Sequence, residues 1–298
     1  MELRVSSSSR SSHDRPSQHA PPFVAGTEFY SYVARGYDQM AGSYDHVEGR
    51  NAISERVRRT TLGAALSTFH KGDRILELGC GTGRDAVEMA LQGIHVVATD
   101  LSSAMVSATQ ERAERHGVAH LVTVKAAPAA VAAQADGPFD GVYSNGAVLN
   151  LEPNLAEVAA GLVKTLRPDG TAILTAANRV SLFELALYPL VLRPRKAFRK
   201  LGATVPIPIS REGRGKTYVV PTRFLTPREF MNLFEGGFDL VSLRALQAIT
   251  PPWNLVDMAV RFRAAVSPLV RIEDRLAEGR LLRNLGAIYL AILRRKGP

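Results

Sequence analysis

The sequence is poor in cysteine, in aromatic residues and in long apolar runs. It has 298 residues and one cysteine, so no disulfide framework can form and we expect a reducing, cytoplasmic setting. No apolar run is long enough to cross a bilayer, and no segment typical of a signal peptide opens the printed chain. Aromatic residues make up 7% of the sequence, which argues against a surface that stacks nucleic acid bases.

Excess positive charge is confined to one segment. The net charge is +9, yet residues 179–223 hold ten Lys or Arg and two Glu, which leaves the rest nearly neutral. A protein that is basic on every side suggests nucleic acid, whereas one basic segment suggests an anionic substrate group, a membrane surface or a solvated lid. We therefore expect no nucleic acid partner.

A glycine-rich turn between two apolar runs is the most informative stretch of the chain. Ile75–Leu78 is a short apolar run typical of a buried parallel strand, and Gly79–Gly83 follows it directly. Arg84–Leu91 then has apolar residues at helical spacing. His95–Thr99 is a second apolar run, and Asp100 ends it. This order predicts a strand–helix–strand unit whose first turn is rich in glycine.

The turn and Asp100 together indicate a nucleoside ligand. Glycines let the backbone approach a ligand closely, and Asp100 at a strand end can accept both ribose hydroxyls. The glycines alone leave two cofactors open. A dinucleotide fingerprint counted from Gly79 needs glycine where Arg84 stands, whereas one counted two residues later ends on a tolerated alanine. Glu77 favours a ligand that carries an ammonium group over a pyrophosphate.

The segment E-L-G-C-G-T-G, Glu77–Gly83, resembles motif I of class I S-adenosylmethionine (SAM)-dependent methyltransferases, and Asp100 matches their ribose-binding acid. The resemblance covers about Phe29–Lys296. It implies an α/β, Rossmann-like fold with a seven-stranded, mostly parallel sheet and helices on both faces. It also implies an N-terminal lid helix, α-helical insertions after strands five and six, SAM as cofactor and S-adenosylhomocysteine as product.

This resemblance sets the expected domain organisation. We expect a disordered tail over residues 1–26, which is rich in serine, and one methyltransferase domain over residues 27–298. Within that domain, residues 179–223 and 250–285 are expected to be inserted segments that cap the substrate. A solvated surface extension is the plainer alternative for the first of them.

The resemblance also assigns the residues that bind the cofactor. They are two tyrosines of the Y-D-x-x-A-x-x-Y-D segment, the acid and glycine turn of motif I, the ribose acid with its neighbours, and residues after strands three and four: Tyr37, Tyr44, Glu77, Gly79, Cys80, Gly81, Gly83, Asp100, Leu101, Met105, Ala126, Ala127 and Asn145. Plainer alternatives are a small filler for Cys80, ordinary core for Met105, and simple amphipathic packing for the helix around Tyr37. The Gly-Asp pair found in many relatives is replaced by Ala126-Ala127.

Three residues are candidates for the reacting end. Asn145 and Asn150 follow the fourth strand, and His46 is the histidine best placed in sequence to act as general base. A partly exposed helical histidine is the plainer interpretation of His46. No metal site is expected, because Gly117 separates His116 from His120 in the one H-x₃-H pair.

The predicted function is transfer of the SAM methyl group to a small, hydrophobic organic acceptor such as a secondary metabolite or a lipid-like compound, on oxygen, nitrogen or carbon. The alternative is a SAM-binding regulatory or scaffold subunit without turnover. Nucleobase methylation is disfavoured, because the proline pair of N-P-P-Y is absent after strand four. Residues 179–223 join an apolar stretch to Arg and Lys, so contact with a membrane surface is also expected.

Overall fold

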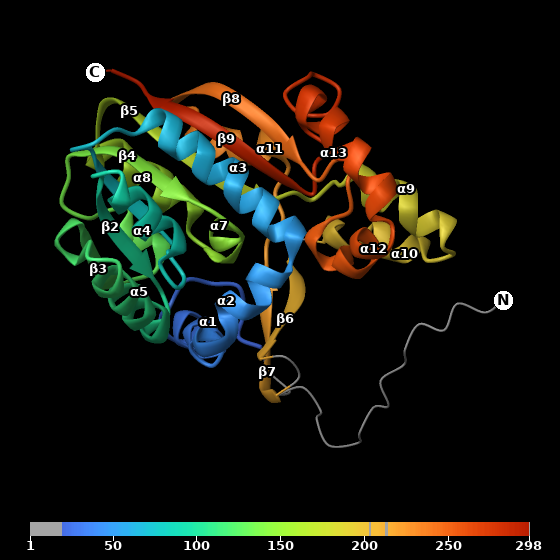
Figure 1. Cartoon of the computed structure of the whole chain (residues 1–298), viewed down its shortest axis with the longest axis horizontal. Coiled ribbons are helices and arrows are strands. Elements are labelled where there is room, and N and C mark those ends of the chain that lie inside the picture. Colours follow the sequence, from blue (N-terminus) through green and yellow to red (C-terminus); the bar gives the residue numbers. More distant parts are fainter. Residues whose placement is uncertain (1–19, 203, 212–213, 298) are drawn as a thin grey trace.

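A seven-stranded sheet forms the centre of the protein (Figure 1). The computed structural model describes residues 20–202, 204–211 and 214–297. Across the sheet the strand order is β3-β2-β1-β4-β5-β9-β8. The strands are β1 (Arg74–Leu78), β2 (His95–Asp100), β3 (Val122–Ala126), β4 (Phe139–Ser144), β5 (Leu166–Ala177), β8 (Phe238–Leu246) and β9 (Ile288–Arg295). β9 pairs antiparallel with β5 and β8, whereas the other neighbouring pairs are parallel, which confirms the predicted sheet.

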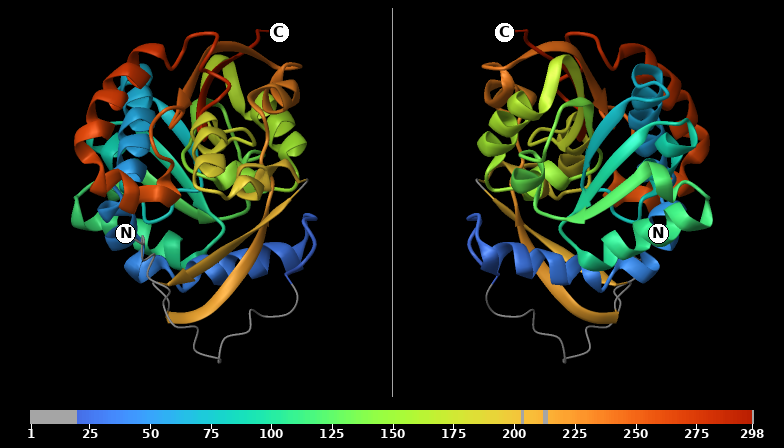
Figure 2. Two further views of the ribbon diagram at one scale, coloured as in Figure 1. Left: turned by 90° about the vertical axis from the view of Figure 1, so that its right-hand side faces the viewer. Right: turned by 90° about the vertical axis from the view of Figure 1, so that its left-hand side faces the viewer.

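Helices cover both faces of this sheet, as predicted (Figure 2). Successive side chains of a strand point to opposite faces, so Ile75 joins one apolar core and Leu76 joins the other. The first core contains residues of α3 (Ala52–Thr68), α4 (Arg84–Leu91) and α5 (Ser103–Arg115). The second contains residues of α6 (Ala129–Ala132), α7 (Val148–Leu151), α8 (Leu155–Thr165) and α11 (Pro227–Phe234).

Polar caps fix where several helices begin. The Asn51 side chain accepts hydrogen bonds from two N–H groups in the first turn of α3, and Ser102 accepts one from the Met105 N–H of α5. Thr226 and Glu229 form a reciprocal capping box at α11, where Pro227 is the first helical residue. The start of α5 matters for function, because it directly follows Asp100.

A third layer covers the carboxyl edge of the sheet. It consists of α1 (Thr27–Asp38), α2 (Ala41–Arg50) and the antiparallel hairpin of β6 (Val205–Arg211) and β7 (Arg214–Thr222). Phe29, Tyr32 and Val33 of α1 pack in one small core with Ile209, Tyr218 and Val220 of the hairpin. The Tyr32 hydroxyl accepts a hydrogen bond from the Val219 N–H at 3.1 Å. The N-terminal helices and the first insertion are therefore one structural unit.

Two details of the predicted fold are wrong. The single lid helix is two helices, because the chain turns at Gln39-Met40. The first insertion is not purely α-helical: after α9 (Leu182–Leu190) and α10 (Pro194–Ala197) it forms the β6–β7 hairpin. The reason is visible in Ile207, Ile209, Tyr218 and Val220, whose spacing of two residues suits a strand with one buried face.

The remaining helical segments lie at one end of the molecule, where α9 and α10 of the first insertion and α12 (Val256–Arg261) and α13 (Arg263–Leu276) of the second are found (Figures 1 and 2). Among the described residues, no helix is both long and apolar enough to span a membrane.

The expected N-terminal tail is partly contradicted. Residues 1–19 lie outside the described part of the chain. Pro21, however, is buried, and the ring of Phe23 packs edge-on against Phe29 with ring centroids 5.5 Å apart. Pro21 and Phe23 therefore pack against the rest of the protein.

Candidate functional site

The backbone of the glycine turn at the end of β1 borders a cavity. Gly79, Gly81 and Gly83 have φ values of 76°, 55° and 77°, a region that favours glycine. The N–H groups of Gly79 and Cys80 both donate to the Thr99 carbonyl at 2.8 Å, which ties the turn to β2. A Cβ on Gly79 would come within 2.1 Å of Val148, so this glycine is required by close packing as well.

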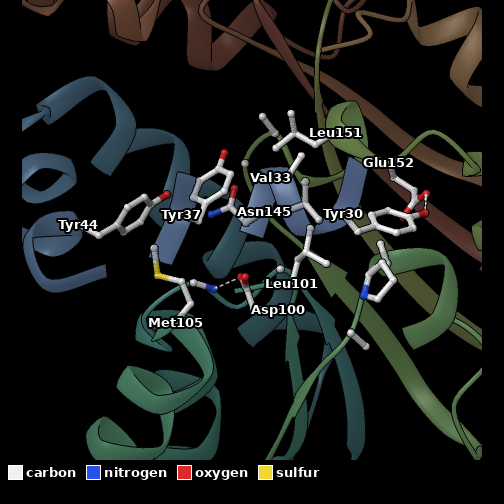
Figure 3. A pocket seen from close by; sticks show the side chains of 18 residues that line it. Tyr30, Val33, Tyr37, Tyr44, Asp100, Leu101, Met105, Asn145, Leu151 and Glu152 are labelled. Carbon is white, nitrogen blue, oxygen red and sulfur yellow. Dashed lines mark hydrogen bonds between the residues drawn. The ribbon is translucent and has the colours of Figure 1, made fainter. Parts of the chain in front are cut away.

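Asp100 links the glycine turn to the start of α5. One carboxylate oxygen accepts a hydrogen bond from the Gly81 N–H at 2.9 Å, and the other accepts one from the Ser102 N–H at 2.9 Å. Burial raises the pKa of the Asp100 carboxyl, although these backbone donors oppose the shift. The carboxylate lies beside Leu101 and Met105 at the wall of a cavity, as the ribose assignment requires (Figure 3).

Glu77 is the clearest sign that the site takes a cationic group. Its side chain is 2% exposed, and its Oε2 atom has no hydrogen-bond partner among the described residues. Burial, with the nearby carboxylates of Asp85 and Asp100, raises the pKa of Glu77 well above its usual range. A buried carboxylate without a partner is costly unless a ligand completes it. The ammonium group of SAM would do so, so the residues present fit this cofactor.

Two cavities that share lining residues lie at the glycine turn. The smaller, of about 130 Å³, is lined by Asp100, Leu101, Met105 and residues after β3. The larger, of about 470 Å³, extends from Glu77 toward the hairpin and the second insertion. Both are lined by Tyr37, Tyr44, Gly79, Gly81, Asn145, Gly146, Ala147 and Leu151. The glycine turn therefore stands between a smaller cavity on the Asp100 side and a larger one on the Glu77 side.

In the Y-D-x-x-A-x-x-Y-D segment, the tyrosines and the aspartates have different roles. Tyr37 and Tyr44 border both cavities, and burial raises the pKa of both hydroxyls. Asp38 accepts hydrogen bonds from the Ser102 hydroxyl and the Ala104 N–H. Asp45 accepts one from the Thr82 hydroxyl and pairs with Arg112. The aspartates thus fasten α1 and α2 to the cofactor end, while the tyrosines face the cavities.

Of the other predicted cofactor residues, some line a cavity and some do not. Cys80 is buried, lines the larger cavity and has its Sγ atom 3.5 Å from the Thr109 hydroxyl. Ala127 lines the smaller cavity together with Pro128 and Ala129, whereas Ala126 is exposed and does not. Gly83 lines neither cavity. A Cβ there would come within 2.6 Å of Thr109, so Gly83 serves the packing of α4 against α5.

Of the three predicted residues at the reacting end, the structure brings only Asn145 to the cavities. Asn145 lies between the two cavities (Figure 3), and its Nδ2 group donates to Asp85 at 3.3 Å. Asn150 is buried elsewhere: its side chain bonds the Ala177 N–H and carbonyl and the Arg223 carbonyl, so its role is structural. His46 is exposed on α2 and lines neither cavity. Neither Asn150 nor His46 is therefore positioned for catalysis.

Several residues of the site were not found from the sequence. Asp85 accepts hydrogen bonds from the Tyr143 hydroxyl at 2.7 Å and from Arg58, and lines the larger cavity. Glu48 lines the same cavity, and its phase on α2 could have revealed it, because it lies four residues after Tyr44. Tyr30 and Glu152, joined by a 2.7 Å hydrogen bond, line the smaller cavity (Figure 3), and no local pattern marked them.

Comparison with known proteins agrees with this geometry. Residues 75–170 match the family model described as "Methyltransferase domain". The chain is 29% identical over 151 residues to O-methyltransferase rstn1 of Aspergillus nomiae, covering 48% of this chain and 66% of the relative. It is 34% identical over 160 residues to nocamycin O-methyltransferase of Saccharothrix syringae, covering 52% and 54%. The chain thus spans less than two thirds of the length of these relatives.

Solved structures share the fold across most of the chain. A structure of the [4+2]-cyclase SpnF has a TM-score of 0.59 at 14% identity, covering 89% of this chain and 96% of its own. A putative sarcosine dimethylglycine methyltransferase from Galdieria sulphuraria has a TM-score of 0.54 at 15% identity, covering 86% and 98%. Likeness at such identity concerns the fold alone.

The sheet order and the glycine turn at the end of β1 define a Rossmann-like fold. Residues 75–170, which match the methyltransferase domain model, lie within this fold and contain both the glycine turn and Asp100.

Proposed function

We propose that the chain is an enzyme that transfers a methyl group from SAM to a small, largely apolar acceptor. The observation that carries this is the buried Glu77, whose Oε2 atom has no hydrogen-bond partner among the described residues, at the point where the larger cavity meets the glycine turn. A nucleoside site that opens into a second, larger cavity suits a reaction between two bound molecules.

The residues of this chain would bind and align the reactants. SAM, when bound, supplies an electrophilic methyl group on a sulfonium sulfur. Asp100 would accept the ribose hydroxyls, Glu77 would pair with the ammonium group, and Leu101 and Met105 would contact the adenine. Tyr37, with the covering layer of α1 and α2, would exclude water from the reacting end. Alignment and exclusion of water are the main contributions that a protein makes to such a displacement.

Glu48, rather than His46, is our candidate for removing a proton from the acceptor. It lines the larger cavity, and burial raises the pKa of its carboxyl. A carboxylate with a raised pKa is a more effective general base near neutral pH. Glu48→Gln should lower kcat while leaving the affinity for S-adenosylhomocysteine unchanged.

Hydroxyl methylation is the reaction that we favour. Two relatives are named as O-methyltransferases, and one of them as acting on nocamycin. The larger cavity supports an apolar acceptor, because its walls include Met40, Val57, Ile207, Phe224 and Trp253.

The test is incubation of purified protein with methyl-labelled SAM and a panel of phenols and hydroxylated polycyclic compounds. We expect label in at least one acceptor. Binding of SAM without transfer to any member would instead favour the non-catalytic SAM-binding subunit.

We also propose that part of the first insertion contacts an anionic membrane surface. Leu190, Leu192, Phe198 and Leu201 are exposed large apolar residues of this segment. Among them stand exposed basic residues that have no ion pair within the described part of the chain: Arg193, Arg195, Lys196 and Arg199. Basic residues near anionic lipid contribute about 1 kcal/mol each. Lys200 does not belong to this set, because it is largely buried and pairs with Glu184 at 2.7 Å.

A further inference from the structure

The larger cavity runs along the carboxyl edge of the sheet and crosses five neighbouring strands. Its floor follows the strand order β1, β4, β5, β9 and β8 with the residues Glu77, Asn145, Ala177, Ile288 and Gln247. Neighbouring strands lie about 4.8 Å apart, so the floor is about 19 Å long. A molecule that reaches from the reacting end to Gln247 is therefore elongated.

Gln247, directly after β8, has its side chain held in one orientation. Its Oε1 atom accepts a hydrogen bond from the Trp253 N–H at 3.3 Å, which assigns the amide oxygen and nitrogen. The Nε2 group has no partner among the described residues, although the residue is 0% exposed. Buried amide donors in native proteins normally have partners, so this one calls for an explanation.

The backbone at Gln247 is also strained, and the second insertion maintains the strain. Gln247 has φ of 60°, a region that residues other than glycine seldom adopt. Glu273 of α13, 1% exposed, accepts hydrogen bonds from the N–H groups of Gln247, Ile249 and Thr250 and from Arg56. Strain that its surroundings hold in place is typical of residues that contact a ligand.

The two ends of the larger cavity therefore offer different hydrogen-bonding groups, an acceptor at one end and a donor at the other. Of the described residues that line it, Glu77 and Gln247 carry buried side-chain atoms without a hydrogen-bond partner. The Glu77 oxygen can accept from a cation, whereas the Gln247 nitrogen can donate to an oxygen. Between them the walls are mainly apolar, and Ile288, which pairs with Leu246, and Trp253, whose N–H bonds Gln247, lie at the Gln247 end.

We propose that Gln247 donates a hydrogen bond from Nε2 to an oxygen of the methyl acceptor. The acceptor is then an elongated apolar molecule with a carbonyl, hydroxyl or ether oxygen at the end remote from the methylated atom. This inference rests on the proposed function, because it assumes that the larger cavity holds the acceptor.

The test compares two probes that differ at one position. 4-Acetyl-4′-hydroxybiphenyl carries a carbonyl at the end remote from its phenol where 4-ethyl-4′-hydroxybiphenyl carries a methylene, and the binding of both is measured by calorimetric titration of protein saturated with S-adenosylhomocysteine. We expect wild type to bind the ketone about tenfold more tightly, as one hydrogen bond to a buried donor allows. Gln247→Met should remove this preference while leaving the affinity for 4-ethyl-4′-hydroxybiphenyl unchanged. Gln247→Leu, whose side chain also has no hydrogen-bond donor, should remove the preference too.

Ile288→Val is the matched control, because it changes the neighbouring floor without changing a polar group. It should keep the preference for the ketone. A preference for the ketone that survives in both Gln247 variants would overturn the inference. It would also be overturned if wild type showed no preference, or bound neither probe. Titration of S-adenosylhomocysteine alone separates the cases: if it fails to bind, the proposed function itself fails.

Discussion

Neutralising Glu77 should weaken cofactor binding and yet raise the stability of the ligand-free protein at neutral pH. In Glu77→Gln the buried carboxylate, whose Oε2 has no partner among the described residues, becomes a neutral amide. A hydrogen bond to a charged group contributes about 1.5–3 kcal/mol, so the affinity for S-adenosylhomocysteine, which keeps the ammonium group, should fall roughly ten- to 150-fold. Calorimetric titration near neutral pH measures this directly.

The same variant should show a defined pH dependence of stability. The pKa of Glu77 in the folded protein is raised above its ordinary value of 4.5, so the folded state binds the proton more tightly than the unfolded state. The stability that the protonated form provides is complete below about pH 4.5 and is lost as the pH rises through the folded-state pKa. Because the amide of the Glu77→Gln variant cannot ionise, the free energy of unfolding of the variant should gain on wild type over that interval.

Glu88→Gln is the matched control for both measurements. Glu88 lies on the next helix, α4, with its side chain 48% exposed, so its neutralisation should change cofactor affinity little. Wild-type affinity in Glu77→Gln would refute the ammonium assignment. A stability difference between Glu77→Gln and wild type that does not vary with pH would refute the argument from burial.

Three further predictions concern the turn, its acid and the surface. Asp100→Asn should weaken S-adenosylhomocysteine binding at least about tenfold, since it loses charged acceptors; a wild-type titration curve would refute the ribose role. Gly81→Val should abolish binding, because φ of 55° is strained for valine and its side chain would fill ligand space; a crystal structure of the variant with the ligand in place would contradict this. Vesicles rich in anionic lipid should bind wild type at low salt and release it as salt rises. Vesicle binding should drop when four exposed basic residues are replaced together by glutamine: Arg193, Arg195, Lys196 and Arg199. Unchanged binding would mean that this patch is only a solvated surface.

Local sequence was enough to predict the strand–turn–helix unit and its acid. The glycines, the apolar runs and Asp100 lie within 27 residues, and each acts through its immediate neighbours. The caps Asn51, Ser102 and Thr226 also work within one helical turn, so helix starts were predictable.

Side-chain direction at longer range was harder to predict. His46 follows Tyr44 by two residues, which is about 200° around a helix, so a tyrosine facing the cavity sends the histidine outward. Asn150 lies in a short helix whose orientation depends on β5 and Arg223, far away in sequence. The backbone and side-chain orientation of Gln247 depend on hydrogen bonds with Glu273 and Trp253, and no spacing rule connects these residues to it.

The most direct test of the central claim is a crystal structure of the full chain with S-adenosylhomocysteine. We predict its ammonium group on Glu77, its ribose hydroxyls on Asp100, its adenine beside Leu101 and Met105, and its sulfur facing the larger cavity. A ligand bound away from the glycine turn, or one whose sulfur is closed off from the larger cavity, would contradict the account.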